Sequence, residues 1–224
     1  MITLATTEDV RARGAAVAVL PVGSFEQHGP HLPLATDTII ACTIANAIAD
    51  AHPVRLLPPI TISCSHEHAA WPGTVSISAR TLHAVVTDIA ESLRGLPLVV
   101  VNAHGGNYVL SNVVQESPRM ALYPTSADWA DARAAAGIET PSNTDMHAGE
   151  IETSILLHAH PEVVRPGYET SDHVADDRRH LLTTGLAPYT ASGVVGRPSR
   201  ASADKGRDLL AALVGGFARH LATL

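Results

Sequence analysis

Carboxylates and imidazoles gather in residues 26–37, which read Glu-Gln-His-Gly-Pro-His-Leu-Pro-Leu-Ala-Thr-Asp. The apolar run 15–22 before them is typical of a buried strand. Side chains two apart on an extended backbone point the same way, so Glu26 and His28 face one point, to which Asp37 can return after the Gly-Pro turn. These residue types are typical of half a two-metal hydrolytic site, in which ions about 3.5–4 Å apart activate water and polarise a carbonyl. The competing interpretation is a polar loop in which Asp37 caps the following helix.

A second cluster follows another short apolar run, 98–102. His104 stands just past this expected strand and is followed by two glycines. Open α/β sheets bind their ligands at the carboxyl ends of strands, and glycine lets the backbone approach a ligand closely. This pattern favours a ligand-binding role for His104.

A third cluster lies in residues 145–154, at the start of an apolar helix. His147 and Glu150 are three residues apart and are expected to share one helical face. Glu152 reaches the same cavity if the helix begins after Gly149. Three such clusters, each beside an apolar element, indicate a shared metal site rather than capped helices and surface histidines.

The elements that must position these clusters alternate along the chain. Strands are expected over 17–22, 98–102 and 120–123, with an extended segment over 54–62. Helices are expected over 37–50, 78–93, 108–116 and 201–221. This alternation implies a doubly wound, mainly parallel sheet. Two stretches, 126–144 and 168–192, break the rhythm and are expected to be irregular connections, the second a solvated polar face.

Bulk properties narrow the class of protein. A chain of 224 residues suits a single domain, 1–224, with a substantial core. The net charge of −7, with Lys205 as the only lysine, argues against nucleic-acid binding. No apolar run approaches the ~20 residues that span a bilayer, and the N-terminus lacks a signal-peptide pattern. We therefore expect no membrane partner and a cytoplasmic location, with Cys42 and Cys64 as thiols.

The motifs, in this order, resemble those of the creatininase (creatinine amidohydrolase) family. They are Leu-Pro-Val-Gly-Ser-Phe-Glu-Gln-His-Gly-Pro-His-Leu-Pro-Leu at 20–34, Thr-Asp-Thr at 36–38, Glu67-His68 with Trp-Pro-Gly-Thr at 71–74, Asn-Ala-His-Gly-Gly-Asn at 102–107, His-Ala-Gly-x-x-Glu-Thr-Ser at 147–154, and the tail segments 193–198 and 201–207. The resemblance implies a three-layer α/β/α sandwich around a mainly parallel sheet. It also implies two divalent ions per subunit, zinc or manganese with iron as a further candidate, hydrolysis of an amide-type C–N bond, and a homo-oligomer, often a hexamer.

The resemblance also implies a set of ligands. Glu26 and His104 would bind the first metal, His28 and a later carboxylate the second, and Asp37 would bridge the two. Glu152 is the first choice for the later carboxylate because it belongs to the family's His-Ala-Gly-x-x-Glu motif. The alternative, on helical geometry, is Glu150.

Catalytic groups are expected among the remaining motif residues. His147 is the candidate for stabilising the oxyanion or moving a proton to the leaving nitrogen, because a histidine near its normal pKa can do either at neutral pH. Glu67 and His68, before the turn at Trp71, are expected to line the pocket, with a purely structural turn as the alternative.

Two positions depart from creatininase proper. That enzyme has a ligand Glu at the place of Gly106 and a closing Trp near the place of Asn143, whereas Trp129 lies well upstream here. Both changes would open the pocket, so creatinine is expected to be a poor substrate.

Three functions remain open on the sequence alone. The first is an amidohydrolase acting on a small or cyclic substrate. The second is a peptidase-like maturation enzyme that trims a modified peptide, as the mycofactocin-pathway relatives do. The third is a non-catalytic metal-binding protein with a closed ligand shell. The glycines after His104 and the complete motif at His147 favour an open, catalytic site.

Overall fold

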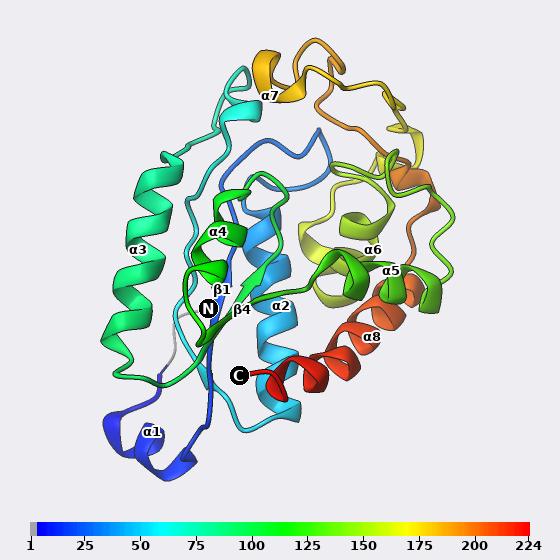
Figure 1. Ribbon diagram of the computed structural model, residues 1–224. Helices are drawn as coiled ribbons and strands as arrows, with labels where there is room; N and C mark the ends of the chain where they lie inside the picture. The colour runs from blue at the N-terminus through cyan, green and yellow to red at the C-terminus, as the bar shows by residue number, and fades with distance from the viewer. Residues whose placement is uncertain (1–3) are drawn as a thin grey trace.

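A parallel four-stranded sheet forms the centre of the computed structural model, which describes residues 4–224 (Figure 1). Its strands, in the order β2-β1-β3-β4, are β1 (Ala18–Val22), β2 (Arg55–Leu56), β3 (Leu98–Asn102) and β4 (Met120–Tyr123). β1 and β3 pair along their whole length, from Ala18 beside Leu98 to Val22 beside Asn102. The two segments that follow these strands therefore leave the sheet at the same edge.

Helices cover both faces of the sheet. One face carries α2 (Thr36–Ala51), α5 (Ser126–Ala135), α6 (Glu150–Ala159) and α8 (Ala203–Leu221), and the other carries α3 (Ala79–Ser92) and α4 (Val109–Gln115). Alternate residues of β1 enter the two cores, Val19 on the first face and Leu20 on the second. Burial on both faces explains why the strands are continuous apolar runs. The expected three-layer α/β/α sandwich is confirmed.

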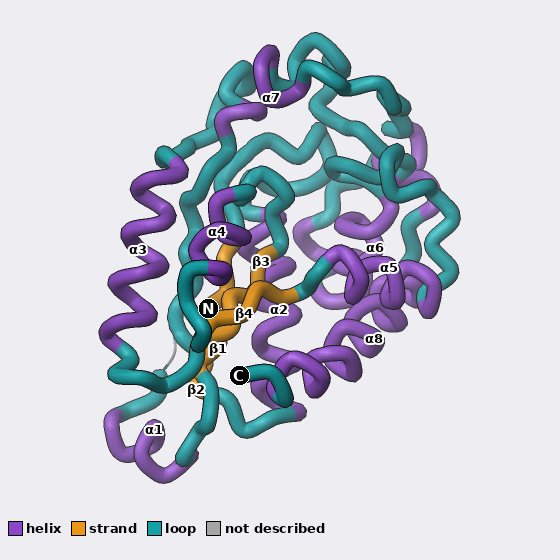
Figure 2. Tube along the Cα trace, viewed as in Figure 1, coloured by secondary structure: helices purple, strands orange, loops and turns teal. Residues whose placement is uncertain are grey.

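Shorter elements complete the chain. They are α1 (Thr7–Arg13), α7 (Leu181–Thr184) and the 3₁₀ turns η1 (His66–His68), η2 (Pro161–Val163), η3 (Tyr168–Thr170) and η4 (Pro198–Arg200). Figure 2 shows the strands confined to the middle of the molecule and the longer loops gathered beyond their carboxyl ends. No helix within residues 4–224 is long and apolar enough to cross a membrane.

Two local predictions are wrong and two are confirmed. The helix predicted over 37–50 is confirmed as α2, but Asp37 is not its cap, because the helix begins at Thr36, after Ala35, which makes no side-chain cap. The segment 54–62 contains no helix, as expected, and pairs with the sheet only at Arg55–Leu56 and at one bridge from Val22 to Ile60. The stretch 126–144 is only partly irregular, because it opens with α5, whose capping box joins Thr125 and Asp128.

Candidate metal centre

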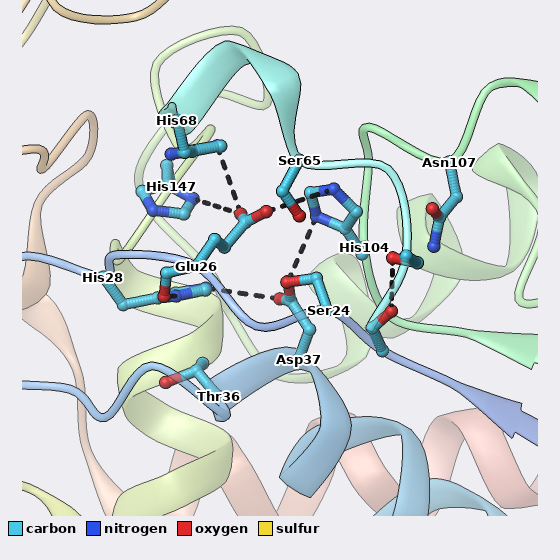
Figure 3. Close-up of polar contacts among 12 residues, drawn as sticks. Ser24, Glu26, His28, Thr36, Asp37, Ser65, His68, His104, Asn107 and His147 are labelled. Carbon is cyan, nitrogen blue, oxygen red and sulfur yellow. Dashed lines mark hydrogen bonds and ion pairs between the residues drawn. The ribbon is translucent and has the colours of Figure 1, made fainter. Parts of the chain in front are cut away.

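Six side chains expected as ligands or catalytic groups converge where the loops leave the carboxyl ends of β1 and β3. Figure 3 shows five of them, Glu26, His28, Asp37, His104 and His147. They form three overlapping triads whose ligand-type atoms lie within 4.8 Å of one another: Glu26, Asp37 and His104; His28, Asp37 and Glu152; and Glu26, His28 and His147. Five of the six are buried, and Glu152 is partly exposed. The arrangement brings residues from three distant segments to one point.

Asp37 lies between two imidazoles and belongs to two of the triads. Its Oδ1 is 3.3 Å from Nε2 of His28, and its Oδ2 is 3.1 Å from Nδ1 of His104. The hydroxyl of Ser24 donates a 2.6 Å hydrogen bond to Oδ2. Burial alone would raise the pKa of Asp37, but His28 and His104 lower it well below its usual value. An ionised carboxylate with its two oxygens turned to different imidazoles has the geometry of a bridging ligand.

Close packing of α2 on β1 brings Asp37 to this point. A Cβ at Gly23 would lie 2.2 Å from the backbone nitrogen of Thr38, so only glycine allows the first turn of α2 to approach the strand end. The hydroxyl of Thr38 then donates to the carbonyl of Ser24 at 3.1 Å. The sequence requirement at Gly23 is therefore a condition for the position of Asp37.

Glu26 is a fully buried carboxylate surrounded by histidines. Its Oε1 is 3.1 Å from Nε2 of His68 and 3.8 Å from Nδ1 of His147, and its Oε2 is 3.2 Å from Nε2 of His104. None of these contacts is aligned as a hydrogen bond, and within residues 4–224 neither oxygen accepts one. Burial raises the pKa of Glu26 to about 8. A buried carboxylate without an aligned hydrogen bond is costly, and a bound cation would remove that cost, so the residues fit a metal.

His104 and His28 hold protons tightly in the metal-free chain. Burial would lower both pKa values, but Glu26 and Asp37 raise that of His104 to about 10, and Asp37 raises that of His28 to about 9. Nε2 of His104 also lies 2.6 Å from the carbonyl oxygen of Cys64, which fixes the ring beside the cluster. Carboxylates that hold protons on two imidazoles are placed to hold divalent cations instead.

Glu152 enters the cluster from the first turn of α6. Its Oε2 accepts a 2.6 Å hydrogen bond from the backbone nitrogen of Ala148, and its Oε1 lies 3.9 Å from Nε2 of His28. Burial raises the pKa of Glu152 to about 7. One oxygen is therefore tethered and the other faces the second triad.

Glu150, the alternative ligand, belongs to none of the triads. It accepts hydrogen bonds from Nζ of Lys205 at 2.6 Å, from the backbone of Glu139 at 3.2 Å and from both the backbone and the hydroxyl of Thr140. The expectation that His147 and Glu150 share a helical face is wrong, because α6 begins only at Glu150 and His147 instead bridges to Val195. Of the two carboxylates in this segment, only Glu152 belongs to a triad that could hold an ion.

His147 has no proton to donate toward the cluster. Burial, followed by the neighbouring His28 and His68, holds its pKa well below the usual value, so the premise of a normal pKa is wrong. Its Nε2 is 2.5 Å from the carbonyl oxygen of Gln27 and must carry the ring proton as the donor in that bond. The lone pair on Nδ1 therefore faces Glu26.

Glu67 and His68 lie on η1, at the edge of the cluster. His68 is buried beside Glu26, and burial together with His28 and His104 lowers its pKa to about 3. Glu67 has a side chain 13% exposed, with Oε1 3.9 Å from Nε2 of His104. A Cβ on Gly106 would lie 2.1 Å from this Oε1. Gly106 thus leaves the space that Glu67 occupies.

Three neighbouring cavities lie at or beside the cluster. A central cavity of about 270 Å³ is lined by Asp37, Glu67, His68, His104, His147 and Glu152. It shares His104, His147 and Glu152 with a cavity of about 360 Å³ on the α5 side, and Glu67 and Tyr108 with one of about 490 Å³ on the α7 side. Space therefore extends away from the cluster in two directions.

Several residues at the site were not predicted from the sequence. Trp129 lies well upstream of the motif at His147 in the sequence. It nevertheless lines the α5-side cavity together with His147, because α5 packs beside this motif. Arg178, from the stretch expected to be a solvated face, lines the central cavity. Ser24 and Gln27 flank Glu26 in the strongest motif, and that proximity was the available signal.

The fold and the cluster define a class of protein: an α/β/α enzyme scaffold that carries metal-binding-capable carboxylates and histidines at the carboxyl edge of its parallel sheet. The family model for creatininase, described as creatinine amidohydrolase, matches residues 3–221, and the chain belongs to this family. It is accordingly a hydrolase that acts on C–N bonds.

Individual relatives give the degree of similarity. The mycofactocin precursor peptide peptidase of Mycobacterium ulcerans (strain Agy99) is 36% identical over 211 residues, covering 88% of this chain and 80% of that protein. The creatinine amidohydrolase of Pseudomonas putida is 26% identical over 243 residues, covering 92% and 89%. A manganese form of creatininase superposes with a TM-score of 0.83 at 23% identity, covering 97% of this chain and 95% of that one. A further creatininase structure is of a Zn-Zn type, with a TM-score of 0.79.

Proposed function

We propose that the chain hydrolyses an amide bond within a peptide and uses two divalent cations to do so. The observation that carries the peptide assignment is the space on both sides of the cluster, about 360 Å³ and 490 Å³. An amide with substituents at both ends needs such space, whereas a small ring needs only the central cavity. The greater identity to the peptidase, 36% against 26% for the creatinine amidohydrolase, supports the same choice.

Two of the triads are the proposed ion sites. Glu26, Asp37 and His104 hold the first ion, and His28, Asp37 and Glu152 hold the second, with Asp37 shared. Oxygen and imidazole ligands suit zinc and manganese, with iron as a further candidate. The carboxylate of Glu26, which accepts no hydrogen bond within residues 4–224, supports the first site, and the two-sided contacts of Asp37 support the sharing.

The remaining residues handle the substrate and its proton. When bound, the ions supply a polarised carbonyl and a water of lowered pKa. His147 lines both the central and the α5-side cavity, and its Nδ1 accepts the proton of the attacking water and returns it to the leaving nitrogen. Glu67 and His68 close the central cavity from η1, Glu67 toward the substrate and His68 against Glu26.

A defined series of peptides tests this function. Protein loaded with manganese or zinc is incubated with synthetic peptides of increasing length, and products are identified by mass spectrometry. We expect cleavage with residues on both sides of the cut, abolished by a chelator. Trp129→Ala and Tyr108→Ala should each raise KM, but for peptides extended in opposite directions, because the two side chains line opposite cavities. Cleavage of no peptide in the series would overturn the proposal.

A small cyclic amide is the second candidate, favoured by the similarity to creatinine amidohydrolase. Creatinine is therefore included in the same assay. We expect poor turnover, because Gly106 and Asn143 stand where a ligand and a closing side chain are expected in creatininase proper. A kcat/KM for creatinine in the ordinary enzyme range of about 10⁴–10⁸ M⁻¹s⁻¹ would reverse the ranking.

The same proposal includes the state of the protein. The chain acts as one domain in a homo-oligomer, a hexamer by resemblance, and works in the cytoplasm. Light scattering on the purified protein measures the assembly, and a monomer at micromolar concentration would contradict it.

A further inference from the structure

Gln27 joins the Glu-x-His motif to two glycines far apart in the chain. Its side chain is buried, and each polar atom has a defined partner. The backbone nitrogen of Gly29 donates to Oε1 at 2.9 Å, and Nε2 donates to the carbonyl oxygen of Gly193 at 3.2 Å. Because one contact requires an acceptor and the other a donor, the two ends of the amide cannot be exchanged.

The fixed amide determines the tautomer of His68. Nε2 of Gln27 lies 2.9 Å from Nδ1 of His68. An amide nitrogen only donates, so Nδ1 must be the acceptor, and the proton of the neutral ring must then lie on Nε2. That N–H group faces Oε1 of Glu26 at 3.1 Å (Figure 3). A protonated nitrogen cannot bind a metal, so His68 orients a ligand and is not one itself.

The two carboxylate oxygens of Glu26 therefore face different partners. Oε1 is directed at His68, whereas Oε2 is 3.2 Å from Nε2 of His104 on the side of the first triad. Oε1 thus faces the N–H of His68, and Oε2, which lies beside His104 in the first triad, is the oxygen placed for an ion. Outer partners of this kind fix the orientation of ligands in many metal sites.

Gly193 belongs to the tail segment 193–198, which the metal triads do not use. Its φ is +87°, and a Cβ there would lie 1.7 Å from Oε1 of Gln27. The glycine therefore leaves the volume that the amide fills. The tail segment thus reaches the cluster through Gln27.

We propose that Gln27 is a positioning residue: through the tautomer of His68 it directs Glu26 to present Oε2 to the first ion. The inference rests on the proposed metal centre. Gln27 belongs to none of the metal triads. An effect on metal binding that disappears when His68 is absent separates this role from a general contribution to folding through the contacts with Gly29 and Gly193.

A double-mutant cycle tests the dependence. Manganese and zinc binding are measured by titration calorimetry and metal analysis in wild type, Gln27→Met, His68→Ala and the double variant, with Gln115→Met, on the surface of α4, as the matched control. We expect Gln27→Met and His68→Ala each to lower the affinity for one ion by about 10–100-fold, the usual range for residues that hold a metal ligand in place. In the His68→Ala background, Gln27→Met should add little. Full additivity of the two effects would overturn the inference.

A second measurement does not depend on metal. Two-bond ¹H–¹⁵N spectra of the histidines distinguish a ring protonated on Nε2 from one protonated on Nδ1. We expect His68 to carry its proton on Nε2 in wild type and on Nδ1 in Gln27→Glu, in which a carboxylate replaces the amide donor. If the tautomer of His68 is unchanged in Gln27→Glu, the inference that Gln27 sets it is wrong. A wild-type protein that binds no metal would contradict the proposed function instead, and the tautomer measurement would still test the link between Gln27 and His68.

Discussion

Two buried polar clusters meet at the first turn of α6, and the pKa of the α6 glutamate is lowered in one and raised in the other. Glu150 accepts hydrogen bonds from Lys205, from the backbone of Glu139 and from Thr140, and Lys205 and Thr140 help to lower its pKa against the effect of burial. Glu152, two residues later, accepts one backbone hydrogen bond, and burial raises its pKa to about 7. Residues two apart on a helix point to opposite sides, which sends the two side chains into the two clusters.

The Glu150 cluster is structural, whereas the cluster with Glu152 is a candidate site for ions. In the first, every oxygen of Glu150 has N–H or O–H donors and the charge is matched by Lys205. In the second, Glu26 accepts no hydrogen bond within residues 4–224, and the charges are matched by imidazoles that can exchange a proton for a metal. Both clusters contain a buried glutamate, so the supply of hydrogen-bond donors to that glutamate is what distinguishes them.

The largest effect is expected at Asp37, the residue common to both proposed ion sites. Asp37→Ala should impair both ions and abolish turnover, because each proposed site loses a ligand at once. The loss of affinity should exceed the ~100-fold upper end for outer partners. Metal analysis after dialysis measures it, with Asp50→Ala, at the exposed end of the same helix, as control. Retention of two tightly bound ions in Asp37→Ala would contradict the bridging assignment.

A smaller effect on turnover is expected at His147. His147→Ala should lower kcat by about 10²–10⁴-fold, the usual contribution of a proton-transferring group. Metal content should stay unchanged if Nδ1 handles a proton. Loss of an ion would instead make His147 a ligand in the triad with Glu26 and His28, which its position also allows. Steady-state kinetics and metal analysis on the same preparation distinguish the two roles.

The sequence predicted one of these clusters better than the other. Glu26, His28 and Asp37 were identifiable because motif spacing and a preceding strand restrict where their side chains can go. The pairing of Glu150 with Lys205 joins positions 55 residues apart, and local periodicity carries no information about such a contact. For the same reason the sequence did not separate Glu150 from Glu152.

Local geometry accounts for the other failures. Ala148 adopts a φ of +52°, which breaks the helical continuity assumed between His147 and Glu150. The competing interpretation of Asp37 as a cap rested on the frequency of carboxylates at helix starts, whereas Asp37 lies inside the first turn of α2 and contacts two imidazoles. Two capping boxes were present in the sequence, Thr6 with Asp9 and Thr125 with Asp128, and would have located α1 and α5.

Breaking the structural cluster should change stability and leave the ions in place. Lys205→Met leaves the buried Glu150 without its cation and should lower the free energy of unfolding by about 3 kcal/mol, the lower end for a broken buried pair, because the lysine is partly exposed. Glu152→Gln should have the opposite pattern: it should lower the affinity for one ion and change the stability of the metal-free protein little. Denaturant unfolding and calorimetry test both variants. Equal effects on metal binding would remove the distinction between the two clusters.

The smallest and most graded effect is expected from pH, because only the ion cluster exchanges protons for metal. In the metal-free chain, Glu26 and Asp37 raise the pKa of His104 to about 10, and Asp37 raises that of His28 to about 9, in both cases against burial. A nitrogen must lose its proton to bind a metal. A raised pKa therefore means that at pH 7 protons occupy both rings and compete with the ions. Affinity should rise with pH, by about tenfold per unit for each proton displaced, and level off above about pH 9–10 as the rings lose their protons unaided.

Calorimetric titrations in buffers of different ionisation enthalpy count the protons released on metal binding and check this directly. We expect net release at pH 7 that decreases toward pH 10. His83→Ala, which removes an imidazole on α3 paired with Glu116 at 3.1 Å, should leave the count unchanged. His104→Gln should lower it together with the affinity of the first ion. A dissociation constant that stays flat from pH 6 to pH 9 would mean that ions bind elsewhere, since no carboxylate–imidazole cluster with these raised pKa values can bind a cation without releasing protons.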